Sequence, residues 1–323
     1  MVEYLKIEKF TLVPCDELAP DISIYTEPDV IEKEILVKKL DFDNHALNSS
    51  LDPDEVSRVE FEDESLFLIW KKPKRVTVDD ILHFGVSSQG FYLTKQHLLV
   101  ITDTPLYRQK DSKPYCKISS PFDAMLDFLY ATICHYYEHL RTIRQISKDL
   151  QSKINSSMGN EHLIQMFGLS ESLTYYLDAI NANNMVLNKI RNHAVKIAIS
   201  QDGIDFLDDL IIDSAQCYKE AEIYSTIISG LLDALGTLVN NNMSKLIKNL
   251  TVVNIIFLPL NLIAGIGGMS EYSVMTHKIP LWLSYCSFFI GMILIAWITL
   301  IFIRKYNLGN AASGKSRNRN RFS

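Results

Sequence analysis

Two asparagines, Asn254 and Asn261, lie in an apolar stretch of the sequence that carries no charge between Lys248 and Glu271. In a helix they fall on one stripe, because residues three or four apart share a face. The stripe consists of Thr251, Asn254, Leu258, Asn261 and Gly265. Amide and carbonyl oxygens are hard donors that suit a hydrated magnesium ion, which releases its water reluctantly. The stripe therefore indicates that these side chains line a cation path, with Leu258 as a hydrophobic constriction. An equally supported alternative is that the asparagines only join helices by hydrogen bonds.

The stripe runs into a glycine-rich segment, Gly265-Ile266-Gly267-Gly268-Met269-Ser270, which Glu271 follows. Glycine permits a sharp turn and close backbone approach, which would bring carbonyl oxygens to the mouth of a pore. We expect a mouth formed by Gly268, Met269, Ser270 and Glu271, although a simple helix end fits the same residues. Pro259 lies inside the apolar stretch and predicts a kink or a freed carbonyl.

Two segments of this sequence are long and apolar enough to cross a membrane. The second charge-free stretch lies between Lys278 and Arg304, with Trp282 and Tyr285 near one end. Each stretch holds roughly the 20 residues that a helix needs to span a bilayer. Both exceed what a compact soluble core usually requires, so two membrane helices are favoured over two buried ones. The asparagines must then face protein or water, and a ring of several subunits meets that need most simply.

The flanking charges predict the orientation of these helices. Basic residues follow the second helix, namely Arg304, Lys305, Lys315, Arg317, Arg319 and Arg321. Because basic residues favour the cytoplasmic side, both termini are expected in the cytoplasm and the short connecting loop outside. The Ser/Asn/Gly-rich tail is interpreted as a solvated, disordered flank rather than a nucleic-acid site.

The residues before the membrane segments predict an α/β domain followed by helices. Hairpins are expected within residues 58–77 and 91–102, and residues 28–48 read as a helix followed by a strand. Pro121 opens a first helix to about residue 154, a second covers about 161–191, and a third runs from about 202 to 266. The sequence predicts a cytosolic α/β domain at residues 1–120 and a helical stalk at 121–249. It then predicts a first span at 250–270, a loop at 271–280, a second span at 281–303 and a basic tail at 304–323.

Several functional classes are disfavoured by the composition. The net charge is −6, the five cysteines form no CxxC pair, and the eight histidines form no HExxH motif. His135 and His139 lie four apart without a nearby third ligand in the sequence. No phosphate-binding loop or catalytic triad is found. We therefore expect neither an enzyme nor a nucleic-acid binder, and no covalently bound cofactor.

The run Leu258-Pro259-Leu260-Asn261-Leu262-Ile263-Ala264-Gly265-Ile266-Gly267-Gly268-Met269-Ser270 resembles the end of the pore helix in CorA-type magnesium transporters. Ser229-Gly230-Leu231-Leu232-Asp233 is similar to the stalk of that family. The order of domains matches over essentially the whole chain. The resemblance implies a funnel-shaped homopentamer in the inner or plasma membrane, with the pore lined by the first membrane helix. It also implies passive transport of Mg²⁺ or another divalent cation, and it favours the pore over simple helix contacts.

The chain departs from the family pattern at the mouth. The hallmark Gly-Met-Asn reads Gly268-Met269-Ser270 here, and an aromatic residue of the family is replaced by Gly267. Serine keeps an oxygen but is shorter, so a ring of serines would hold a hydrated ion less closely. The loop lacks the Met-Pro-Glu run of the family and retains Glu271. A broader divalent channel, a Zn²⁺, Co²⁺ or Ni²⁺ transporting relative, and a scaffold or sensor that no longer conducts all stay open.

The resemblance also implies regulation by the transported ion. In the family, intracellular magnesium bridges carboxylates of neighbouring subunits and holds the channel shut. Asp209 falls at the matching stalk position, with Asp208 and Asp213 beside it. From the residues alone, these three acids more often form a solvated helix face.

Overall fold

The computed structural model describes residues 1–16, 20–39, 43–62, 65–78, 81–107, 117–154, 160–194, 199–269, 274, 278 and 280–319. The chain divides into two compact units, Met1–Asp233 and Ala234–Ser323. We call them unit 1 and unit 2 and describe each by itself.

Unit 1 is built on a seven-stranded mixed sheet. Its strands are β1 (Val2–Glu8), β2 (Thr11–Pro14), β3 (Ile22–Thr26), β4 (Arg58–Phe61), β5 (Ser65–Val78), β6 (Ile81–Thr94) and β7 (Leu98–Thr102). The order across the sheet is β2-β1-β3-β7-β6-β5-β4. Within this sheet β3 and β7 pair in parallel, and the other neighbouring strands pair antiparallel.

Both predicted hairpins are present. β4 pairs with β5 and β6 pairs with β7, in each case antiparallel. The prediction for residues 28–48 is wrong in its second half, because helix α1 (Val30–Lys39) is followed by a second helix, α2 (Asn44–Leu51), where a strand was expected. Asp43 explains the second helix, since its side chain accepts hydrogen bonds from the backbone N–H groups of His45 and Ala46. An aspartate N-cap followed by apolar residues at helical spacing favours a helix over a strand.

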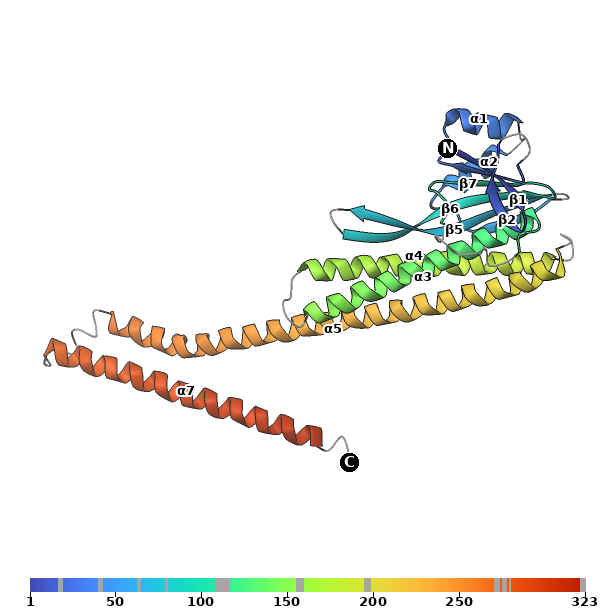
Figure 1. Ribbon diagram of the computed structural model, residues 1–323. Helices are drawn as coiled ribbons and strands as arrows, with labels where there is room; N and C mark the ends of the chain where they lie inside the picture. Colours follow the sequence, from blue (N-terminus) through green and yellow to red (C-terminus); the bar gives the residue numbers. More distant parts are fainter. Residues whose placement is uncertain are drawn as a thin grey trace. The chain divides into compact units, whose positions relative to one another are not determined.

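The sheet is covered on both faces (Figure 1). On one face, Leu36 of α1 and Leu47 of α2 pack in a buried cluster with Phe67 and Ile69 of β5. On the other face lie α3 (Pro121–Ile154) and α4 (Asn160–His193), which both contact β5 and β6. β5 is accordingly buried without interruption from residue 66 to residue 73. Residues 66–70 form the continuous apolar run that is typical of a strand covered on both sides, and Lys71 and Lys72 are buried after it.

Local signals position the two helices on the sheet. Ser120 and Asp123 form a reciprocal cap at the start of α3: the Asp123 carboxylate accepts from the Ser120 N–H at 3.0 Å, and the Ser120 Oγ accepts from the Asp123 N–H at 3.2 Å. On α4, the side-chain amide of Asn183 accepts from the Lys71 N–H at 3.0 Å and donates to the Lys71 carbonyl at 2.8 Å. β4 begins at Arg58, which pairs with Ile69, so β4 has no residue opposite Lys71 and Asn183 supplies the pairing there.

The remaining helices carry the apolar stretches of unit 2. α5 runs from Gln201 to Gly267 and continues through Pro259. α7 runs from Leu281 to Arg319, so the expectation of a disordered flank is wrong for residues 304–319. The predicted helices of residues 121–154, 161–191 and 202–266 are therefore confirmed by α3, α4 and α5 within a few residues. Both α5 and α7 contain a segment long and apolar enough to cross a membrane.

Candidate functional site

The predicted stripe lies on the exposed surface of α5 in unit 2. Thr251, Asn254, Leu258, Asn261 and Gly265 are all exposed in the single chain, and Leu258 retains 70% of its accessible surface. The half-buried residues of the same segment lie on the opposite face: Val252, Ile256, Pro259, Leu260 and Ile263. The two asparagines therefore point away from the side of the helix that is sheltered within the chain.

An exposed amide is costly wherever it would face hydrocarbon. Both backbone and side-chain polar groups need partners in a bilayer, because no water is present to satisfy them. The Thr251 hydroxyl meets this requirement within the helix by donating to the Ile247 carbonyl at 2.8 Å. The amides of Asn254 and Asn261 are exposed on the same stripe, so a neighbouring protein surface or a water-filled path must cover them.

The end of α5 is closed by backbone hydrogen bonds. The Gly268 N–H donates to the Ala264 carbonyl and the Met269 N–H donates to the Ile266 carbonyl, each at 3.1 Å. Met269 is 53% exposed. Of the four predicted mouth residues, Gly268 and Met269 are described, whereas Ser270 and Glu271 lie outside the described residues.

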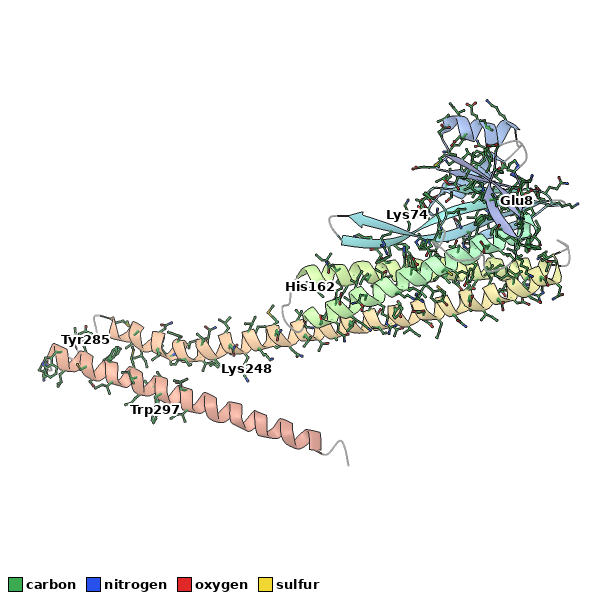
Figure 2. All side chains as sticks on the ribbon, in the orientation of Figure 1. Glu8, Lys74, His162, Lys248, Tyr285 and Trp297 are labelled. Carbon is green, nitrogen blue, oxygen red and sulfur yellow. The ribbon has the colours of Figure 1, made fainter. Side chains whose placement is uncertain are left out.

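α7 offers a second apolar surface. Trp282, Tyr285 and Trp297 are each more than half exposed, and the apolar segment as a whole is almost entirely unburied within the chain. Figure 2 marks Lys248 on α5, at the start of the charge-free stretch, and Tyr285 and Trp297 on α7. Exposed apolar helices of this length require a bilayer or further protein around them.

The three predicted regulatory acids lie in different surroundings on α5 in unit 1. The Asp208 carboxylate is held by Arg191 of α4, with Nε at 2.5 Å from Oδ1 and a terminal nitrogen at 3.0 Å from Oδ2. The hydrogen bond from Arg191 lowers the pKa of Asp208. Asp209 is exposed, and partial burial together with the charge of Asp209 raises the pKa of Asp213.

Asp209 and Asp213 lie four residues apart on one helix face, where like charges repel. A divalent cation would relieve that repulsion. Within one chain, however, the described residues contain no group of three or more His, Cys, Asp or Glu side chains able to hold a metal ion. Further ligands for a cation at this face would have to come from another molecule.

Sequence reasoning missed the role of Arg191. An indirect signal was present, because a short connection between antiparallel helices brings the last turn of α4 close to the first turns of α5. Arg191 lies in that last turn, 17 residues before Asp208. The spacing does not reveal which of the neighbouring acids Arg191 selects.

Known proteins resemble this chain over most of its length. The family model described as CorA-like Mg²⁺ transporter protein matches residues 23–305. The cobalt/magnesium transport protein CorA of Methanocaldococcus jannaschii is 26% identical over 276 residues, which is 83% of this chain and 84% of that protein. The protein of the same description from Thermotoga maritima is 25% identical over 224 residues, which is 67% of this chain and 63% of that protein.

The fold agrees with a solved member. The complete structure of the CorA magnesium transporter from Methanocaldococcus jannaschii superposes with a TM-score of 0.75 at 20% identity, covering 94% of this chain and 97% of that one. That likeness demonstrates the shared fold, and the family model covers most of the chain. The chain therefore belongs to the CorA-like Mg²⁺ transporter family, a family of membrane divalent-cation transporters rather than enzymes.

Proposed function

We propose that several copies of this chain form a passive pore for hydrated divalent cations, with Mg²⁺ as the principal ion. The observation that carries this proposal is the exposed stripe of α5, where Asn254 and Asn261 point away from the sheltered face of the helix. A ring of such stripes would surround a water-filled axis with neutral oxygens, and Leu258 would narrow it. Members of the family are homopentamers, so we expect five copies in the ring.

The membrane arrangement follows the flanking charges. Residues 250–270 and 281–303 are assigned as the two spans, with residues 271–280 outside and the basic tail 304–323 in the cytoplasm. Residues 1–120 and 121–249 then form the cytosolic α/β domain and stalk. Gly268, Met269, Ser270 and Glu271 would line the outer mouth, where Ser270 offers one hydroxyl oxygen per subunit.

A metal panel in proteoliposomes tests the proposal directly. Uptake of Mg²⁺, Co²⁺, Ni²⁺ and Zn²⁺ is measured separately with an imposed gradient and no nucleotide, against vesicles without protein. We expect saturable Mg²⁺ uptake, and Co²⁺ is the first competitor because the curated relatives are described as cobalt/magnesium transport proteins. Preferential Zn²⁺ or Ni²⁺ uptake would support a pore but contradict Mg²⁺ as its principal ion.

Ser270 favours a second candidate function, that of a CorA-shaped scaffold or sensor without conduction. Serine replaces the asparagine of the family hallmark and is shorter. A ring of serines from several subunits would therefore contact a hydrated ion less closely. This candidate predicts no uptake of any of the four metals above the empty-vesicle level, and no growth rescue of a strain deficient in magnesium transport. Robust uptake of one metal eliminates it.

Asp209 and Asp213 are proposed to hold a regulatory cation between subunits. Their mutual repulsion on one helix face, where Asp209 is exposed and Asp213 is half-buried, supports this assignment, whereas Asp208 would first have to exchange Arg191 for the metal. Changing both Asp209→Asn and Asp213→Asn is expected to raise the Mg²⁺ concentration that half-inhibits uptake by about tenfold or more, because two of the carboxylates that attract the ion are lost. The measurement is uptake into vesicles with varied Mg²⁺ on the side of the soluble domain.

The matched control is Asp202→Asn, which removes an exposed carboxylate from the first turn of the same helix. Its inhibition curve should coincide with that of the unaltered protein. An unchanged curve in the double variant would mean that these acids form only a solvated helix face.

A further inference from the structure

A stack of aromatic and imidazole rings joins the segment after β7 to helices α3 and α4 in unit 1. The ring of Tyr107, in the segment after β7, lies parallel to that of His135 on α3 with centroids 4.3 Å apart. His135 meets His139 edge to face at 4.5 Å. His139 stacks on Tyr176 of α4, and its Nδ1 lies 2.5 Å from the Tyr176 hydroxyl. Phe84 of β6 makes edge-to-face contacts with His139 and Tyr176.

The segment that carries Tyr107 is anchored to the sheet at its other end. The Lys72 ammonium of β5 is paired with Asp103 at 2.9 Å and donates to the Thr104 carbonyl at 3.1 Å. Lys74 pairs with the other oxygen of Asp103 at 2.9 Å. Residues 103–107 thus connect the sheet to the histidines of α3, and the histidines connect this segment to α4.

Burial favours the neutral forms of both imidazoles, and most of the charges that face them act in the same direction. Arg75 of β5 lies over the Phe84 ring, and with Lys72 it opposes a positive charge on His135, while Glu138 of the same helix favours one. Burial outweighs the carboxylate and lowers the pKa of His135 to about 4. His139 is 2% exposed, and burial, His135 and Arg75 together lower its pKa to about 3. The described ion pairs include neither imidazole.

We propose that this ring stack is an acid-sensitive joint, in which protonation of His135 and His139 opens the contact between residues 103–107, α3 and α4. Two imidazolium groups 4.5 Å apart repel each other, and each loses solvent in the closed stack. Opening restores solvent to both rings, so protons bind preferentially to the open form. The inference concerns unit 1 alone and does not depend on whether the chain conducts ions.

The pH dependence of opening follows from proton linkage. The closed stack holds both histidines neutral, whereas solvated histidines have a pKa of about 6.5. Each histidine therefore contributes a factor of about 10 to the opening constant between pH 7.5 and pH 5.5, and the two together contribute about 100. The contact is therefore stable at a pH above the pKa of a solvated histidine and weakens as the pH falls below that pKa.

Hydrogen exchange of the full chain in lipid nanodiscs measures this opening. Protection factors, which remove the chemical pH dependence of exchange, are compared at the two pH values for peptides covering residues 132–140 and 172–180. The unaltered protein is expected to lose about 100-fold protection there, and His135→Gln about tenfold. The double variant His135→Gln/His139→Gln should lose almost none. His162 lies on α4 (Figure 2) and takes no part in the ring contacts above, so His162→Gln is the matched control and should behave like the unaltered protein.

The outcomes separate the joint from general acid sensitivity. A loss below threefold in the unaltered protein overturns the proposal, as does an equal loss in the double variant. If the double variant does not fold, the loss of protection in His135→Gln tests the proposal by itself. That ring is half-exposed, so replacing it disturbs the packing less. A 100-fold loss in His135→Gln would place the sensitive groups elsewhere in unit 1.

Discussion

Replacing Asn261 with leucine is expected to reduce Mg²⁺ uptake in proteoliposomes to below about a tenth of the unaltered rate. The variant exchanges a ring of neutral oxygens for a second ring of apolar side chains, beyond that of Leu258. A hydrated magnesium ion retains its water shell and would find no partner for it at this level. Initial rates of uptake under an imposed gradient give the measurement, with the amount of reconstituted oligomer determined in the same vesicles.

The control for this variant is the same exchange on another face of the same helix. Asn249 precedes Asn261 by 12 residues and thus lies about 120° around the helix from it, and further from the centre of the stripe. Asn249→Leu should leave uptake within about twofold of the unaltered protein. If Asn261→Leu assembles normally and conducts at the unaltered rate, the stripe does not line the ion path.

Loss of the Asn183 side-chain amide is expected to lower the stability of unit 1 strongly. Asn183 is 2% exposed and accepts hydrogen bonds from the Ser57 hydroxyl at 2.7 Å and the Lys71 N–H at 3.0 Å. Asn183→Leu leaves these donors and the Lys71 carbonyl without partners in the core. Each unpaired buried group costs about 1–3 kcal/mol, so the free energy of unfolding is expected to fall by roughly 3–5 kcal/mol.

Pulse proteolysis of the full chain in increasing urea provides that free energy without a spectroscopic signal from the membrane helices. Asn181→Leu is the matched control, since Asn181 lies two residues away on the same helix and is exposed. Its effect should stay within about 0.5 kcal/mol. A similar loss in both variants would show that the leucine disturbs α4 itself and that the contact with Lys71 contributes little.

Long periodic segments were well predicted because their signal is local. The apolar spacing in residues 121–154 and the start at Pro121 specify α3, and the Ser120–Asp123 cap agrees with them. The second helix at residues 44–51 was missed because it is short. Its main signal is one aspartate that the sequence offers equally to a turn. The sequence predicts the buried arms of the hairpins as strands, but it does not predict which other strands lie beside them in the sheet.

Taken alone, the sequence determined the two membrane-length segments, their flanking charges and the asparagine stripe, because each depends on spacing along one stretch of chain. Only the tertiary structure decided which polar groups meet. Asn183 bonds to Lys71, which is 112 residues away in the sequence. Arg191 pairs with Asp208 rather than with the other two predicted regulatory acids. The two histidines of α3 have no third metal ligand nearby in the sequence, and in the structure they form a ring stack with Tyr107 and Tyr176. Such contacts depend on how helices pack on the sheet, and no local pattern of residues encodes that packing.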